Sequence, residues 1–149
     1  MNLLDSLKEN NSVAVQQEAD NWEDAINVCL APLVKNNAIE KKYIESIIER
    51  TKELGPFYIL APGLAMPHER PEMGVNKNSF SFVTLKKPVL FPDGQEVDIL
   101  IGLAAENDEV HAGEAIPQIV MLFDDEEIFD KIREAKEAED IYRLIEEKV

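Results

Sequence analysis

The hydrophobic residues of this chain fall into segments with two different spacings. In residues 22–34 and again in residues 40–53, apolar side chains recur three and four positions apart, the spacing that lines one face of an α-helix. Asp20 or Asn21 is placed to cap the first helix, and Gly55-Pro56 ends the second. The apolar positions are Trp22, Ala25, Ile26, Cys29, Leu30, Leu33 and Val34 in the first helix, and Tyr43, Ile44, Ile47 and Ile48 in the second.

Shorter apolar segments between turn residues predict β-strands over residues 12–15, 57–61, 80–85 and 97–105. The last of these is an almost unbroken apolar run. A strand of that kind is buried on both faces of its sheet, so helices must cover the sheet on each side.

The carboxyl-terminal third predicts three more helices. Asn107 or Asp108 is placed to cap the first, and Pro117 is expected to delay its regular part. The residues expected to point inward are Ile116, Ile119, Val120 and Phe123 in this helix, Ile128, Phe129 and Ile132 in the next, and Ile141, Leu144 and Ile145 in the last. The predicted fold is an α/β sandwich, a small mixed β-sheet with helices on both faces, and 149 residues suit one domain over 1–149.

The composition narrows the classes of partner. A formal net charge of −15 disfavours binding to nucleic acid or to anionic lipid. The acidic surface serves solubility, or it suits a protein partner with a basic face. The sequence shows neither a secretory signal nor a membrane-spanning stretch, so we expect a cytoplasmic protein that does not insert into membranes. The single cysteine, Cys29, lies on a helical apolar stripe and is expected to be buried and inert.

The segment from Gly55 to Glu72 concentrates the candidate chemistry. Pro62-Gly63 follows a predicted strand, and His68 lies between Pro67 and Pro71. Each proline restricts its own backbone and that of the residue before it, so we predict a stiff loop that presents His68.

The chain has only two histidines, His68 and His111, and each follows a predicted strand. Ligand sites in open α/β sheets gather beyond the carboxyl ends of strands, so both imidazoles could meet in one crevice. A neutral imidazole can accept a phosphoryl group and pass it on. Charge on that group could be neutralised by backbone N–H groups of residues 65–69, by Arg70 or by His111. The alternative for His68 is a structural histidine in a tight turn.

Other chemistries have weaker support in the sequence. His68 with Glu69 and Glu72, or His111 with nearby carboxylates, supplies metal-ligand types but no recognised metal-binding spacing. The chain has no G-x-S-x-G elbow for a serine hydrolase and no glycine-rich phosphate loop. We therefore expect neither a functional metal nor a cofactor.

The sequence from Gly55 to His68, GPFYILAPGLAMPH, resembles the phosphorylation-site segment of the mannitol/fructose-type enzyme IIA domains (EIIA type 2) of the bacterial sugar phosphotransferase system, or PTS. It is most similar to the ascorbate-specific branch of that family. The likeness extends over essentially the whole chain, through residues 82–88 and 97–101 to residues 118–123.

The resemblance implies a cytoplasmic phosphocarrier. His68 would take a phosphoryl group from the phosphocarrier protein HPr and give it to a cysteine of the cognate enzyme IIB, which serves a membrane IIC. His111 would stabilise the group without carrying it, and Arg50 is a candidate for an arginine that contributes in some family members. Related sequences often have a small residue where this chain has Glu69, so we expect Glu69 to face solvent.

The resemblance also suggests how partners would dock. HPr would meet an acidic rim around His68, with exposed Leu64 and Met66 as the apolar centre, although the two side chains could instead pack the loop. The alternative function is a regulatory module of the same fold that senses phosphorylation state without carrying a phosphoryl group.

Overall fold

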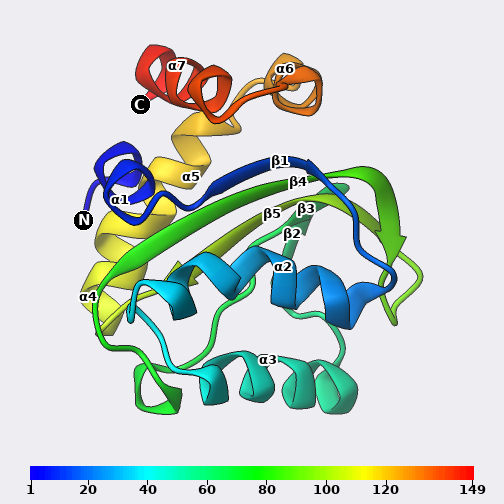
Figure 1. The fold of residues 1–149 in the computed structure, drawn as a ribbon, viewed down its shortest axis with the longest axis vertical. Helices are drawn as coiled ribbons and strands as arrows, with labels where there is room; N and C mark the ends of the chain where they lie inside the picture. Colours follow the sequence, from blue (N-terminus) through cyan, green and yellow to red (C-terminus); the bar gives the residue numbers. More distant parts are fainter.

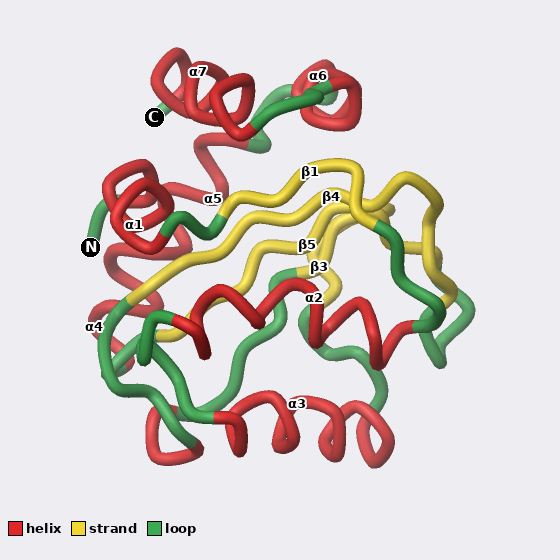
Figure 2. Tube along the Cα trace, viewed as in Figure 1, coloured by secondary structure: helices red, strands yellow, loops and turns green.

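The computed structural model describes residues 1–149, and its centre is a five-stranded mixed β-sheet (Figures 1 and 2). The strand order is β1-β4-β5-β3-β2, in which β1 pairs with β4 and β3 pairs with β5 in parallel, while the other two pairings are antiparallel. The strands are β1 (Val13–Gln17), β2 (Ile59–Ala61), β3 (Gly63–Ala65), β4 (Ser79–Leu90) and β5 (Glu96–Ala104).

Helices cover both faces of the sheet, which confirms the predicted fold class. In Figure 1, α2 and α3 lie on one side of the strands, and α1, α5 and α7 lie on the other. The helices are α1 (Leu3–Asn10), α2 (Trp22–Lys35), α3 (Lys41–Leu54), α4 (Asp108–Val110), α5 (Ile116–Leu122), α6 (Glu127–Glu134) and α7 (Ala138–Lys148), with a 3-10 turn η1 (Pro71–Met73) and a π-helical turn η2 (His111–Ala115).

Two hydrophobic cores sandwich the sheet because successive residues of a strand point to opposite faces. In β4, Phe82 packs into the core beneath α1, α5, α6 and α7, whereas its neighbour Val83 packs into the core beneath α2 and α3. Ile101 and Leu100 of β5 divide in the same way. This explains the almost unbroken apolar run in β5.

Side-chain caps define the starts of two predicted helices. The Asn21 side chain accepts a hydrogen bond from the Asp24 amide at 2.9 Å, and the Asn107 side chain accepts one from the Val110 amide at 2.9 Å. Each asparagine was one of two predicted caps. Regular α-helix resumes only at Ile116, after the π-helical turn, so the delay expected from Pro117 is confirmed.

Cys29 is fully buried against Ser81, as predicted. Burial raises the pKa of its thiol to about 12, so the thiol stays protonated and inert. None of the helices combines the length and the apolar composition that are needed to span a bilayer.

The structure corrects several predicted elements. Helix α1 was not predicted, because eight residues show too few repeats of a helical pattern; its position depends on contacts from elsewhere in the chain, such as the Phe80 amide donating to Ser6 Oγ at 2.8 Å. Strand β3 was also missed, β2 starts at Ile59, and β4 continues past the predicted end to Leu90. The inward orientation predicted for Val120 is wrong, because its side chain is exposed.

Candidate active site

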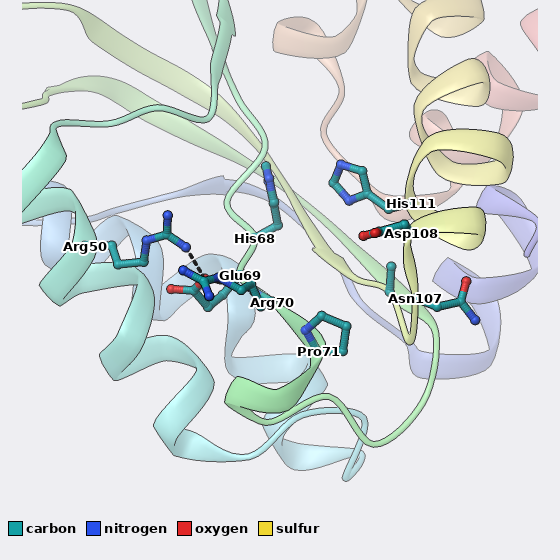
Figure 3. A pocket seen from close by; sticks show the side chains of 9 residues that line it. Arg50, His68, Glu69, Arg70, Pro71, Asn107, Asp108 and His111 are labelled. Carbon is teal, nitrogen blue, oxygen red and sulfur yellow. Dashed lines mark hydrogen bonds and ion pairs between the residues drawn. The ribbon is translucent and has the colours of Figure 1, made fainter.

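A pocket of about 320 Å³ opens where the loop after β3 faces the start of the helical segment after β5 (Figure 3). Seven of its nine lining residues are polar or charged, and both histidines of the chain lie in it. The lining residues are Arg50, His68, Glu69, Arg70, Pro71, Ala105, Asn107, Asp108 and His111.

The His68 ring is held by its own loop. Its Nδ1 lies 2.7 Å from the carbonyl oxygen of Met66, and this oxygen can only accept. Nδ1 therefore carries the proton, and the lone pair of the neutral ring lies on Nε2, which has no hydrogen-bond partner in the protein. The loop is tied to the sheet because the Leu103 amide of β5 donates to the Pro67 carbonyl at 3.1 Å.

His111 comes from the opposite wall of the pocket. Its backbone amide donates to the Asn107 carbonyl at 3.1 Å, and it begins the π-helical turn η2. Such single π turns are frequent at functional sites. The ring centroids of His68 and His111 are 4.9 Å apart, with the planes tilted by 54°, so the structure brings the two predicted histidines side by side.

An aromatic ring and a guanidinium flank His68 on its other side. The Phe57 ring meets the His68 ring edge-on at 5.7 Å, and the Arg50 guanidinium lies 5.1 Å from the Phe57 centroid. Arg50 of α3 therefore lies in the wall of the pocket, and its side chain remains 31% exposed.

The expectation that Glu69 faces solvent is wrong. Its side chain is only 1% exposed and points toward α3. One carboxylate oxygen accepts from Ser46 Oγ at 2.7 Å, and the other accepts from Arg50 at 2.6 Å and from the Arg70 amide at 2.9 Å. A carboxylate can be buried at this position because three donors replace its hydration.

Leu64 and Met66 are also not exposed. They are 2% and 1% exposed, respectively, and belong to the core beneath α1 and α5. The structure supports the alternative interpretation, in which these two side chains pack inside the protein and do not form a docking surface. The apolar side chain beside His68 that reaches solvent is Phe57, at 42% exposure.

Tyr43 is a site-supporting residue that the sequence did not reveal. Its buried hydroxyl accepts from the Glu69 amide at 2.9 Å and donates to the Leu103 carbonyl of β5 at 2.7 Å. The segment directly after His68 is thereby pinned to the sheet. The helical pattern predicted a buried residue at this position, but it could not predict what the hydroxyl would contact.

Replacing Tyr43 with phenylalanine is expected to lower the free energy of unfolding by about 2 kcal/mol, because a buried amide and a buried carbonyl lose their partner. Chemical denaturation measures the change. Tyr142→Phe is the control, since no hydrogen bond involves the Tyr142 hydroxyl, and it should change stability by less than about 0.5 kcal/mol. Equal effects of the two substitutions would contradict the pinning role.

The protonation of His68 is expected to depend on its surroundings. Burial lowers the pKa of His68 below its ordinary value of 6.5, and the neighbouring His111 acts in the same direction, although the Met66 carbonyl opposes them. Between that lowered pKa and 6.5 the unfolded chain binds more protons than the folded one, so stability should fall as pH drops below about 6.5. Nuclear magnetic resonance titration of the ring protons should give a midpoint below 6.5, and a higher midpoint would contradict this reading.

The structure places no group of three histidine, cysteine, aspartate or glutamate side chains close enough to hold a metal ion. Glu69, one of the possible ligands considered with His68, is instead bound to Ser46 and Arg50.

Comparison with known proteins identifies the family. Residues 6–148 match the model of the family described as phosphoenolpyruvate-dependent sugar phosphotransferase system, EIIA 2. Over 148 residues the chain is 45% identical to the ascorbate-specific PTS system EIIA component of Salmonella typhimurium, covering 98% of this chain and 96% of that protein. The protein of the same name from Escherichia coli K12 matches with the same identity and coverage.

Solved structures agree with this assignment. The crystal structure of PtxA, described as a PTS IIA protein of Streptococcus mutans, has a TM-score of 0.97 at 42% identity and covers 99% of this chain and 95% of that one. The solution structure of CmtB, the mannitol-specific cryptic phosphotransferase enzyme IIA of E. coli, has a TM-score of 0.85 at 35% identity, with coverages of 95% and 99%. Since both sequence and fold match over nearly the full length, this chain belongs to the EIIA 2 family of the phosphoenolpyruvate-dependent sugar phosphotransferase system.

Proposed function

We propose that this protein is a cytoplasmic phosphocarrier for ascorbate uptake, with residues 1–149 acting as one carrier domain. It accepts a phosphoryl group from phospho-HPr on His68 and passes it to a cysteine of its cognate enzyme IIB, which supplies a membrane IIC. Membership of the EIIA 2 family supports the place in the cascade. The name shared by the 45% identical relatives supports ascorbate as the substrate of the system.

The observation that carries the proposal is the hydrogen bond of 2.7 Å between His68 Nδ1 and the Met66 carbonyl. It selects the tautomer whose lone pair is on Nε2, at the pocket that also holds His111 and Arg50. The lowered pKa of His68, caused mainly by burial, favours the neutral and nucleophilic ring.

The first transfer, from phospho-HPr to His68, is a displacement at phosphorus. The Nε2 lone pair of His68 forms the new N–P bond, while the bond between phosphorus and the donor histidine breaks and returns its electron pair to that ring. Positive charge then develops on the His68 ring, whose Nδ1–H remains bound to the Met66 carbonyl. The carbonyl dipole stabilises that charge, so no proton has to move during the step.

Positioning and charge stabilisation supply most of the catalysis in phosphoryl transfer. The ring centroid of His111 lies 4.9 Å from that of His68. At this distance His111 donates a hydrogen bond to an oxygen of the phosphoryl group on His68. In the second transfer, a cysteine thiolate of enzyme IIB attacks phosphorus, an S–P bond forms, and the electron pair of the N–P bond returns to His68.

Docking of the donor uses charge and one exposed aromatic ring. The net charge of −15 attracts a partner with a basic face, and the association rate should fall as salt is raised. Phe57, exposed beside His68, takes the apolar role first assigned to Leu64 and Met66.

Incubation with radiolabelled phosphoenolpyruvate, enzyme I and HPr tests the proposal. The expected result is one phosphate per chain, labile in acid and stable in base, that leaves when a cognate enzyme IIB is added. Faster discharge by an ascorbate-type than by a mannitol-type IIB would support the ascorbate assignment, and equal rates would contradict it. A chain that binds HPr but takes up no label would instead be the regulatory module.

A further inference from the structure

The charges in the pocket are balanced, although the chain as a whole is strongly acidic. The charged side chains beside the two histidines are Arg50, Arg70, Glu69 and Asp108, two of each sign. Only Arg50 and Glu69 are paired with each other, through an ion pair of 2.6 Å. The Glu69 carboxylate is therefore the group that sets how much positive charge Arg50 offers to the pocket.

Glu69 is held firmly enough for that role. It is buried to 1% side-chain exposure, and its oxygens accept from Ser46, Arg50 and the Arg70 amide. Burial alone would raise the pKa of Glu69, but these donors, led by the Ser46 hydroxyl, hold it below its ordinary value. The carboxylate is therefore ionised at neutral pH.

We propose that Glu69 is a positioning residue that tunes phosphoryl transfer by neutralising part of the charge of Arg50. The inference deepens the proposed function and depends on it. A phosphoryl group brings a charge of about −1.5 to −2 into the pocket. With Glu69 ionised, Arg50 holds that group loosely, and the carrier can release it to the next protein.

The contacts around Glu69 distinguish tuning of the Arg50 charge from simple support of the loop. Tyr43 and the Leu103 amide already tie the His68 segment to β5 without any contribution from the Glu69 carboxylate. Two of the three donors to the carboxylate, Ser46 and Arg50, are side chains of α3, and the third is the backbone amide of the adjacent Arg70. Removal of the carboxylate should therefore change charge more than it changes the backbone.

Glu69→Gln tests the inference because glutamine keeps the shape and loses the charge. The equilibrium with phospho-HPr should shift toward the phosphorylated chain by about tenfold, and discharge to enzyme IIB should slow by a similar factor. If the variant loses both phosphoryl acceptance from phospho-HPr and discharge to enzyme IIB, as expected for a purely structural role, the inference is overturned. Glu72→Gln, an exposed carboxylate in the same loop, is the matched control and should leave both steps unchanged.

A double-mutant cycle shows whether Glu69 acts through Arg50. In an Arg50→Gln background, Glu69→Gln should no longer shift the equilibrium. A shift of the same size in both backgrounds would overturn the inference. If the wild-type protein accepts no phosphate at all, the proposed function fails. If the wild type accepts phosphate and the Glu69→Gln variant behaves like it, only the inference about Glu69 fails.

The His68 titration gives a readout that needs no phosphoryl transfer. The ionisable groups around this ring are Arg50, Glu69, Arg70, Asp108 and His111. The Glu69 charge raises the pKa of His68 and the Arg50 charge lowers it, so Glu69→Gln should give a lower midpoint than wild type. An unchanged midpoint would overturn the inference. Should Glu69→Gln not fold, Arg50→Gln carries the titration: the Arg50 charge lowers the pKa of His68, so its loss should raise the midpoint, and an unchanged midpoint would overturn the inference.

Discussion

Replacing His68 with glutamine is expected to abolish phosphoryl uptake from phospho-HPr, slowing it by at least about 10⁴-fold. The glutamine amide has no lone pair on nitrogen that can attack phosphorus, so the displacement has no nucleophile. The neighbouring His111 does not substitute for it, because only His68 has its free Nε2 set by a bond from Nδ1 to a carbonyl. Rapid-quench labelling with radioactive phosphoenolpyruvate measures the loss.

The folding of the His68→Gln variant is checked by measuring its free energy of unfolding as a function of pH. The pKa of His68 is lowered mainly by burial, so the wild type loses stability as the pH falls below about 6.5. The variant lacks this group and should lose less stability over that range while matching the wild type at pH values well above it. Label that persists on the folded variant would show that the phosphoryl group resides elsewhere.

Replacing His111 with alanine is expected to slow phosphoryl transfer by about 10²-fold, with little change in the KM for phospho-HPr. The ring lies 4.9 Å from that of His68, close enough to donate to a phosphoryl oxygen as the N–P bond forms. Such a donor acts mainly in the transition state, so its loss lowers kcat more than it weakens docking. Single-turnover transfer at several concentrations of phospho-HPr separates the two parameters.

The control for His111→Ala is His111→Gln, whose amide retains an N–H donor and should recover part of the lost rate. Both variants should still take up one phosphate per chain, because His68 is intact. An effect confined to KM, or a complete loss of labelling, would contradict the assignment of His111 as a stabilising group.

The spacing of apolar residues predicted those helices and strands that are long enough to contain several repeats of the pattern. The stripes of α2 and α3 and the apolar run of β5 were recognisable, and their burial follows the pattern. Helix α1 and strand β3 are too short for that. Their positions depend on long-range bonds, such as the Leu3 amide to Gln118 and the parallel pairing of β3 with β5.

The sequence predicted the two histidines of the pocket, but it did not predict the residues that support them. The prolines around His68 and the position of His111 after a strand were visible in the sequence. The burial of Glu69 was not, because an isolated acidic residue in a loop favours solvent unless donors converge on it. Two of those donors, Ser46 and Arg50, come from α3, 23 and 19 residues before Glu69 in the chain.

By itself, the order of residues determined the main helices, the buried central strands and the loop that carries His68, since these depend on neighbours a few positions apart. Only the tertiary structure decided that Tyr43, Ser46 and Arg50 of α3 converge on Glu69. It also decided that the two imidazoles share one pocket. The physical reason is that hydrogen bonds and charge pairs act over a few ångströms in space, and the partners of Glu69 and His68 are brought within that range only when the helices pack on the sheet.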